Sequence, residues 1–183
     1  ASIYGDELDG VIFLGTGNQP KAVVDSGLKL AHIAKLVRGE RYRSELLNTI
    51  MFGAYNKRIK DNRTANDWLT KDTKIVDEYL SDPKCSYKFT ANAYIGFLNV
   101  IKYDIDKKNI AKTPDKLPVL FASGLEDPVG DYGKGVKKAF KMYTKYVDNV
   151  ELYLYEDDRH ELHSETDRED IFSDLYEWIE ENV

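Results

Sequence analysis

Three short apolar runs constrain the fold of this chain more than any other feature. They cover residues 11–14, 118–122 and 150–155, and the first two are apolar without interruption. A strand that is apolar on both faces is typical of a parallel sheet with helices on both sides, whereas alternation marks a sheet with one wet face. The third run alternates and carries two tyrosines. Because helical patterns separate the runs, we predict an α/β fold with three parallel strands, flanking helices and right-handed crossovers.

A long stretch without a strand pattern separates the first run from the second. Helical spacing of apolar residues recurs there at 22–38, 41–52, 73–80 and 90–103. Helices that extend so far between two strands of one sheet form a subdomain rather than a loop. We therefore expect an α/β core made of residues 1–17 and 115–183, with an inserted all-helical cap of residues 18–114.

Two helix starts are marked by polar residues. Thr90 precedes the helical pattern at 90–103 and is predicted to cap it. Thr166 and Glu169 have the spacing of a capping box, in which a hydroxyl and a carboxylate satisfy backbone N–H groups of the first turn. We therefore predict that Thr166 is the N-cap of the C-terminal helix.

An acid and a histidine lie just past the ends of two predicted strands. Asp127 follows the run at 118–122, and His160 follows the run at 150–155. Since ligand and catalytic sites of parallel sheets lie at the carboxyl ends of the strands, we expect these side chains to be close together. A carboxylate bound to one imidazole nitrogen holds the tautomer that lets the other nitrogen act as the base for a serine nucleophile.

Other candidates for these roles lie nearby. Glu126 and Asp131 are rival acids, His163 is a rival base, and a helix-capping role for Asp127 stays open. None of the 183 residues is a serine in the Gly-x-Ser-x-Gly turn that presents a nucleophile. Ser123 has a glycine on one side only, and its strand is predicted to bury it. The acid and the base are therefore expected here without their nucleophile.

These segments resemble parts of a known family. Residues 117–136, LPVLFASGLEDPVGDYGKGV, are similar to the acid loop of the α/β-hydrolase superfamily, and most similar to its bacterial lysophospholipase and monoacylglycerol-lipase-like group, often labelled serine aminopeptidase domain. Residues 155–166, YEDDRHELHSET, resemble the histidine loop of that group. Residues 10–17 resemble the strand after the nucleophile helix, and residues 64–72 and 82–85 resemble pieces of the helical cap. The resemblance covers nearly the whole chain.

The resemblance implies that Asp127 is the acid and His160 the base of a Ser-Asp-His triad. It also implies that the nucleophile lies about one helix before the strand at residue 11, ahead of Ala1, in an N-terminal half that includes the rest of the sheet. We therefore expect the C-terminal portion of a serine hydrolase that cleaves carboxylic esters through an acyl-enzyme. Without the serine and the oxyanion hole, the 183 residues alone are expected to be inactive.

The substrate expected from the resemblance is a small lipid-like ester, as for a lysophospholipase or monoacylglycerol lipase. Phe52, Tyr55 and Trp68 supply aromatic surface for an acyl chain, whose burial contributes about 0.8 kcal/mol per methylene. Taken singly, each of these residues is more typical of the core of the cap. Two alternatives stay open: a serine peptidase of the aminopeptidase type on the same scaffold, and a non-catalytic fragment or binding module.

Composition excludes several other classes. The chain has 32 acidic and 26 basic residues, a net charge of -6, and no concentrated basic face, so we do not expect it to bind nucleic acid. The single cysteine, Cys85, rules out an internal disulfide framework and predicts a reducing, cytoplasmic location. No apolar run is long enough for a transmembrane segment.

Cofactors and assembly complete the expectations. The sequence His160-Glu161-Leu162-His163 lacks the histidine pair spaced i, i+4 of a zinc helix, so neither a metal nor a cofactor is expected. The expected partners are the missing N-terminal half and the ester substrate. Since the strand at residue 11 would pair with a strand of that half, its edge is predicted to be open and to allow homo-oligomers.

Overall fold

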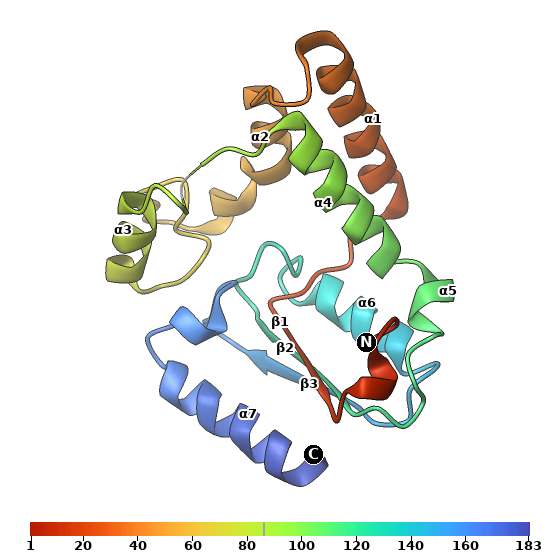
Figure 1. Cartoon of the computed structure of the whole chain (residues 1–183). Helices are drawn as coiled ribbons and strands as arrows, with labels where there is room; N and C mark the ends of the chain where they lie inside the picture. The colour runs from red at the N-terminus through yellow and green to blue at the C-terminus, as the bar shows by residue number, and fades with distance from the viewer. Residues whose placement is uncertain (86) are drawn as a thin grey trace.

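The computed structural model describes residues 1–85 and 87–183, and a three-stranded parallel sheet forms the centre of its lower half (Figure 1). β1 (Val11–Leu14), β2 (Val119–Gly124) and β3 (Val150–Tyr155) are neighbours in that order. Val119 of β2 is in register with Val11 on one side and Val150 on the other. The predicted α/β fold class with three parallel strands is confirmed.

Helices supply the rest of the regular structure. The α-helices of the described residues are α1 (Lys21–Arg38), α2 (Glu45–Phe52), α3 (Thr73–Ser81), α4 (Ala91–Asp104), α5 (Lys107–Ile110), α6 (Lys134–Tyr143) and α7 (Arg168–Asn182). Short 3-10 helices are η1 (Gly5–Glu7), η2 (Tyr55–Arg58) and η3 (Leu162–Ser164). The helical patterns at 22–38, 73–80 and 90–103 are confirmed as α1, α3 and α4, while α5 had no counterpart among the predictions.

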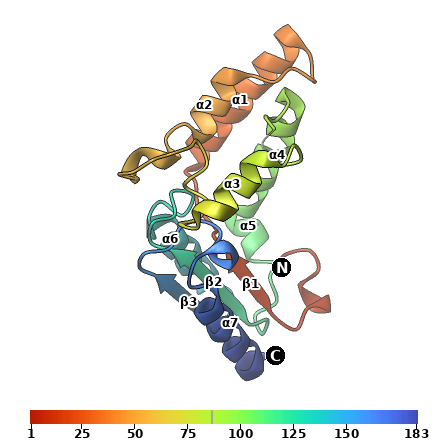
Figure 2. The same cartoon turned by 90° about the vertical axis from the view of Figure 1, so that its left-hand side faces the viewer.

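The central strand explains why helices cover both faces of the sheet. Every residue of β2 is buried, and successive side chains of a strand point to opposite faces. Phe121 packs on one face with Val136 of α6, and Ala122 packs on the other with Ile171 of α7. Figure 2 shows α6 and α7 on opposite sides of the strands. This arrangement leaves the carboxyl ends of the strands free to carry a site.

Side-chain caps decide where two of the helices begin. Ser44 accepts a hydrogen bond from the N–H of Leu47 at 3.2 Å, so α2 begins at Glu45 and the predicted start at residue 41 is wrong. Thr90 accepts from the N–H of Ala93 at 3.1 Å, which confirms it as the cap of α4. In both cases the side chain satisfies a first-turn donor that the helix itself leaves free.

The capping box predicted at Thr166 is wrong. The helix α7 begins at Arg168, and its N-cap Asp167 makes no side-chain capping bond. The chain is still turning at that point, because the N–H of Arg168 bonds back to the carbonyl oxygen of Glu165 at 3.3 Å. The exit from η3 therefore moves the N-cap from the predicted Thr166 to Asp167, one residue later.

The helices between β1 and β2 have cores of their own. Val24 and Leu28 of α1 pack on Leu98 of α4. A Cβ at Gly27 would lie 3.2 Å from Leu98 Cδ1, so the glycine lets the two helices approach closely. This cluster shares no buried residue with the cluster between the sheet and α6. The division at residues 17 and 115 stays a prediction.

A helix that crosses a bilayer needs about 20 mostly apolar residues. None of the described helices is both long enough and apolar enough to meet this need.

Candidate active site

The ends of β2 and β3 are joined through their loops. The N–H of Leu125 donates to the carbonyl oxygen of Tyr155, and the N–H of Glu126 donates to that of Asp158, both at 2.8 Å. The contact is so close that a Cβ at Gly124 would lie 2.0 Å from the Asp158 carbonyl oxygen. The two loops predicted to carry the acid and the base are thus brought together at one edge of the sheet.

Asp127 is the acid that this arrangement places beside a histidine. It is fully buried, and its Oδ1 accepts a hydrogen bond from the N–H of Val129 at 2.7 Å. Its Oδ2 lies 3.1 Å from His160 Nδ1. A buried carboxylate bound on both oxygens has a fixed orientation. The rival acids Glu126 and Asp131 are exposed.

His160 approaches β1 as well as Asp127. Its side chain is 26% exposed, whereas His163 and His32 are exposed residues. Gly15, directly after β1, has a φ of 59°, and a Cβ there would lie 2.5 Å from the His160 carbonyl oxygen. Only glycine adopts this conformation readily and tolerates this contact. The sequence pattern did not predict this role for Gly15.

The three aromatic residues expected to bind substrate form one cluster beside the base. Their ring centroids are 5.8 Å apart for Phe52 and Tyr55, 4.8 Å for Tyr55 and Trp68, and 6.4 Å for Phe52 and Trp68. The ring centroid of Trp68 lies 5.2 Å from that of His160. Burial and the negative charge of Asp127 raise the pKa of Tyr55, so its hydroxyl stays protonated near neutral pH. We call these three residues the aromatic cluster.

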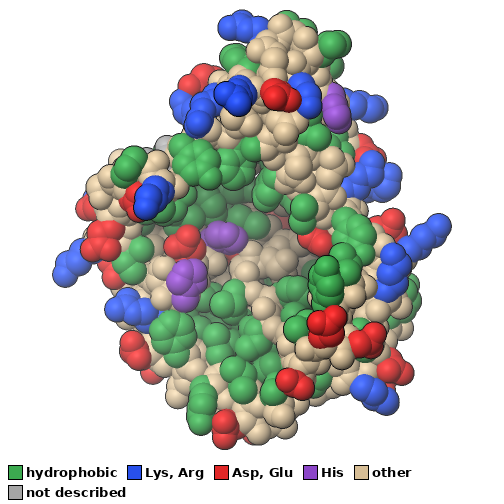
Figure 3. Space-filling view, in the orientation of Figure 1, with side chains coloured by type: hydrophobic (Ala, Val, Ile, Leu, Met, Phe, Trp, Pro, Cys, Tyr) green, Lys and Arg blue, Asp and Glu red, His purple; other side chains and the backbone are tan. Residues whose placement is uncertain are grey.

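A cleft of about 390 Å³ opens next to the acid loop. Its lining residues are Asn18, Gln19, Pro20, Ala54, Tyr55, Pro128, Asp131, Tyr132, Lys134, Gly135 and Lys138. It shares Tyr55 with the aromatic cluster, but neither Asp127 nor His160 lines it. Figure 3 shows hydrophobic side chains gathered around a hollow between the helical segment and the sheet, with histidine side chains beside it. Beside His160 itself, the apolar surface is that of Trp68, whose ring lies against the imidazole.

The other candidate nucleophiles do not fit such a site. Ser123 is fully buried, as its strand predicts, and its hydroxyl lies 3.3 Å from the carbonyl oxygen of Gly124. Burial and the charge of Asp82 raise the pKa of the Cys85 thiol, which disfavours the reactive thiolate. Within residues 1–85 and 87–183, no three His, Cys, Asp or Glu side chains are grouped so as to hold a metal ion.

Comparison with protein families agrees with this geometry. Residues 2–167 match the family described as serine aminopeptidase, S33. The chain belongs to this family of α/β-hydrolases. The match covers nine-tenths of this chain and includes both the acid loop and the histidine loop. Among curated proteins, the comparison found no match.

Solved structures share the fold. A thermostable carboxyl esterase from Bacillus coagulans, in complex with glycerol, is 23% identical with a TM-score of 0.88, and the match covers 99% of this chain and 59% of the esterase. A lipase in an open form is 26% identical with a TM-score of 0.81, over 98% and 59% of the two chains. A soluble variant of monoglyceride lipase from Saccharomyces cerevisiae is 20% identical with a TM-score of 0.65, over 99% and 56%. The chain therefore spans less than two thirds of the length of these structures.

Proposed function

We propose that this chain carries the acid and the base of a serine hydrolase that cleaves carboxylic esters through an acyl-enzyme. The observation that carries the proposal is the 3.1 Å contact between His160 Nδ1 and the buried Asp127 Oδ2 at adjoining strand ends. With Nδ1 held by the carboxylate, Nε2 is the nitrogen that exchanges protons with a serine. The serine itself lies outside these residues in our proposal, which fits the share of the related structures that the chain covers.

The proposed reaction has two stages. The serine oxygen attacks the ester carbonyl carbon while His160 Nε2 takes the hydroxyl proton, and the C–O bond to the leaving alcohol breaks as that proton passes to the alcohol oxygen. Water then gives a proton to His160 and adds its oxygen to the acyl carbon, and the serine leaves with the proton. Asp127 orients the imidazole and stabilises the imidazolium in both stages.

The proposed substrate is a lipid-like ester such as a monoacylglycerol or a lysophospholipid. The aromatic cluster supports it, because the ring of Trp68 contacts that of His160, and Tyr55 and Phe52 pack against Trp68. An acyl chain on this surface would place its carbonyl carbon near the imidazole. Related folds include a carboxyl esterase and a monoglyceride lipase.

A peptidase is the second candidate, because the family description names a serine aminopeptidase. An aminopeptidase needs negative groups for the free ammonium of its substrate. The cleft beside the site has Lys134 and Lys138 against Asp131, which gives an ammonium group little to bind. We therefore favour the ester. Comparing hydrolysis of p-nitrophenyl esters with that of aminoacyl p-nitroanilides decides between the two.

The assignment of the acid and the base is tested by two matched pairs of variants in the complete protein. We expect a fluorophosphonate to label the complete protein, and Asp127→Asn to lower kcat/KM for a p-nitrophenyl ester by about 10⁴-fold, as in a protease triad. His160→Ala should abolish the labelling. The controls Glu126→Gln and His163→Ala alter exposed neighbours and should leave kcat/KM unchanged.

Two results would contradict the proposal. If Glu126→Gln lowered kcat/KM as much as Asp127→Asn does, Asp127 would not be the acid of the triad. Stoichiometric labelling of the 183 residues alone would place the nucleophile inside them.

A further inference from the structure

Two segments far apart in the sequence hold His160 against Trp68. We call residues 67–71 the strap and residues 158–165 the histidine loop. The carbonyl oxygen of Trp68 accepts the N–H of His160 at 3.4 Å, and that of Leu69 accepts the N–H of Glu161 at 2.7 Å. The two peptide units that flank His160 are therefore both bound to the strap.

The side chain of Arg159 joins the same two segments again. Its Nη1 donates to the carbonyl oxygen of Asp67 at 2.7 Å and to that of Thr70 at 3.0 Å. A guanidinium presents its donors in one rigid plane, so these bonds fix the curvature of the strap around Trp68. Arg159 directly precedes His160, so the hydrogen bonds of its backbone and of its side chain both help to hold His160 against Trp68.

Glu165 binds both segments with one carboxylate. It is fully buried. Its Oε1 accepts the N–H of Arg159 at 2.7 Å, and its Oε2 accepts the N–H of Lys71 at 3.0 Å. The hydroxyl of Thr70 also lies 3.0 Å from Oε2. Burying a carboxylate costs free energy unless every oxygen has partners, and here the partners come from the strap and from the residue next to the base.

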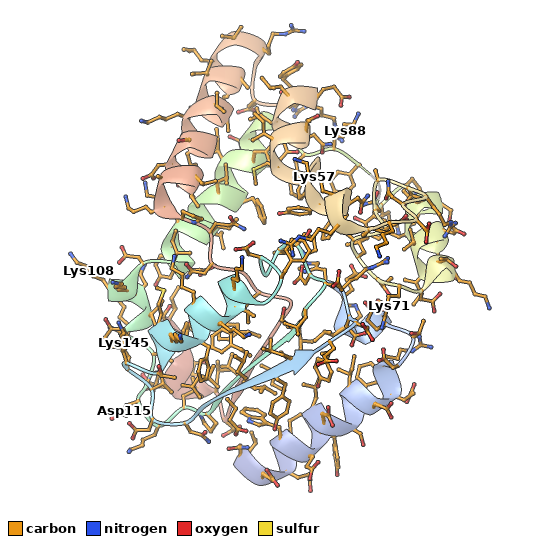
Figure 4. The ribbon with its side chains drawn as sticks, turned by 180° about the vertical axis from the view of Figure 1, so that it is seen from behind. Lys57, Lys71, Lys88, Lys108, Asp115 and Lys145 are labelled. Carbon is orange, nitrogen blue, oxygen red and sulfur yellow. The ribbon has the colours of Figure 1, made fainter. Side chains whose placement is uncertain are left out.

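Lys71 places a positive charge beside two buried carboxylates, those of Asp158 and Glu165. Lys71 Nζ lies 2.5 Å from Oδ1 of Asp158, whose side chain is 2% exposed. Figure 4 labels Lys71 where the chain before α3 meets the loop that follows β3. Its ammonium compensates the charges of Asp158 and Glu165. We call Lys71, Asp158, Arg159 and Glu165 the Glu165 cluster.

We propose that Glu165 is a positioning residue for the base, and that the Glu165 cluster makes the strap and the histidine loop one rigid body. Trp68 and His160 then move together, so the distance between an acyl chain bound on Trp68 and the imidazole stays constant. The part of this inference that concerns reaction rate rests on the proposed function. Its structural part is independent of any activity.

The structural part is tested by NMR on the 183-residue chain. We expect two signals in the wild type: the His160 Nδ1 proton, which reports on the contact with Asp127, and an NOE between the rings of Trp68 and His160. Glu165→Gln keeps the shape of the side chain but turns one acceptor oxygen into an NH₂ donor that faces a backbone N–H. It should weaken or abolish both signals.

Glu151→Gln is the matched control. Glu151 lies on β3 and accepts a hydrogen bond from Trp178 Nε1 at 2.9 Å, away from the strap, so its variant should keep both signals. Arg159→Lys keeps the charge but loses the planar donors, and it should lose the NOE while the amides of β2 and β3 stay protected. Wild-type signals in folded Glu165→Gln or Arg159→Lys would overturn the proposal. Global unfolding of both variants would overturn it too, because a cluster confined to two loops leaves the sheet folded.

The kinetic part uses the complete protein. A displaced base lowers kcat by about 10²-fold per ångström of misplacement, so Glu165→Gln should lower kcat for a p-nitrophenyl ester to that degree. Glu151→Gln should not lower it. An unchanged kcat in Glu165→Gln would overturn the positioning role. If the complete protein had no hydrolase activity, the proposed function would be contradicted. The NMR experiment would then decide by itself whether the strap and the histidine loop form one rigid body.

Discussion

Asp67 illustrates how one buried side chain sets the path of the strap. Its Oδ2 accepts the N–H of Arg63 at 2.5 Å and that of Thr64 at 3.1 Å, and its Oδ1 accepts the Thr64 hydroxyl at 2.5 Å. Burial raises the pKa of the carboxyl, but these hydrogen bonds outweigh it and hold the pKa below its usual 3.8. The turn that they close leads directly into Trp68, so the position of the aromatic cluster depends on this carboxylate.

Asp67→Asn should therefore lower the free energy of unfolding by about 1–3 kcal/mol at neutral pH, because the N–H groups of Arg63 and Thr64 and the Thr64 hydroxyl lose a charged, buried acceptor. Since the folded pKa lies below the unfolded one, the stabilisation is present above the unfolded value of 3.8 and is lost as the pH falls through the folded value. Urea unfolding at several pH values should show the difference between variant and wild type shrinking in acid. Asp77→Asn, which removes an exposed ion pair with Arg63, is the control with little effect. A difference independent of pH would refute this account.

At the scale of helices and strands, the chain has separate apolar clusters. Phe121 of β2 and Val136 of α6 belong to the cluster under the sheet, whereas Leu98 of α4 packs on Val24 and Leu28 of α1. Stability need not be uniform when clusters share no buried side chain, because each can open with its own free energy. The helical segment can therefore loosen while the sheet that carries Asp127 and His160 stays intact.

Leu98→Ala tests this separation. Leu98 is 3% exposed, and truncating such a side chain costs about 2–5 kcal/mol. We expect faster hydrogen exchange in α1 and α4, with unchanged protection in β2. Val100→Ala on the same helix changes a side chain that is 59% exposed and should have no such effect. Equal acceleration in β2 would mean that the clusters unfold as one unit.

Over the whole molecule, β1 is the outer strand of the sheet in the described residues, with β2 as its neighbour. Leu14 at its end is 41% exposed, and Ile3 before it is 66% exposed. Hydrophobic side chains cover much of the face shown in Figure 3. An open strand edge with apolar surroundings favours pairing with another chain. We propose that the 183-residue chain pairs with a second copy along β1.

Sedimentation velocity over a range of concentrations tests this association. We expect dimers of the chain, and Leu14→Lys should shift them toward monomer because a charge at the edge opposes pairing. Leu36→Lys changes a side chain on α1 that is 87% exposed and should leave the dimers intact. A monodisperse monomer at all concentrations would count against the proposal.

Local patterns were enough to predict the three strands and the meeting of Asp127 with His160. The apolar runs that end near Asp127 and His160 predict both strands, and parallel pairing alone brings their ends together. The pattern at 41–52 failed at its start because the cap Ser44 lies inside it. The box at Thr166 failed because a backbone bond to Glu165 holds the preceding turn.

The sequence by itself determined the parallel sheet and placed Asp127 and His160 after two of its strands, because apolar periodicity is a property of neighbouring residues. Only the tertiary structure decided that Gly15 lies against His160 and that Trp68 meets the imidazole. Glu165 and Arg159 hold that contact by bonds to backbone groups, and Arg159 lies 92 positions from Asp67, whose carbonyl it binds. Every residue has such a carbonyl, so a bond of this kind leaves no pattern in the sequence.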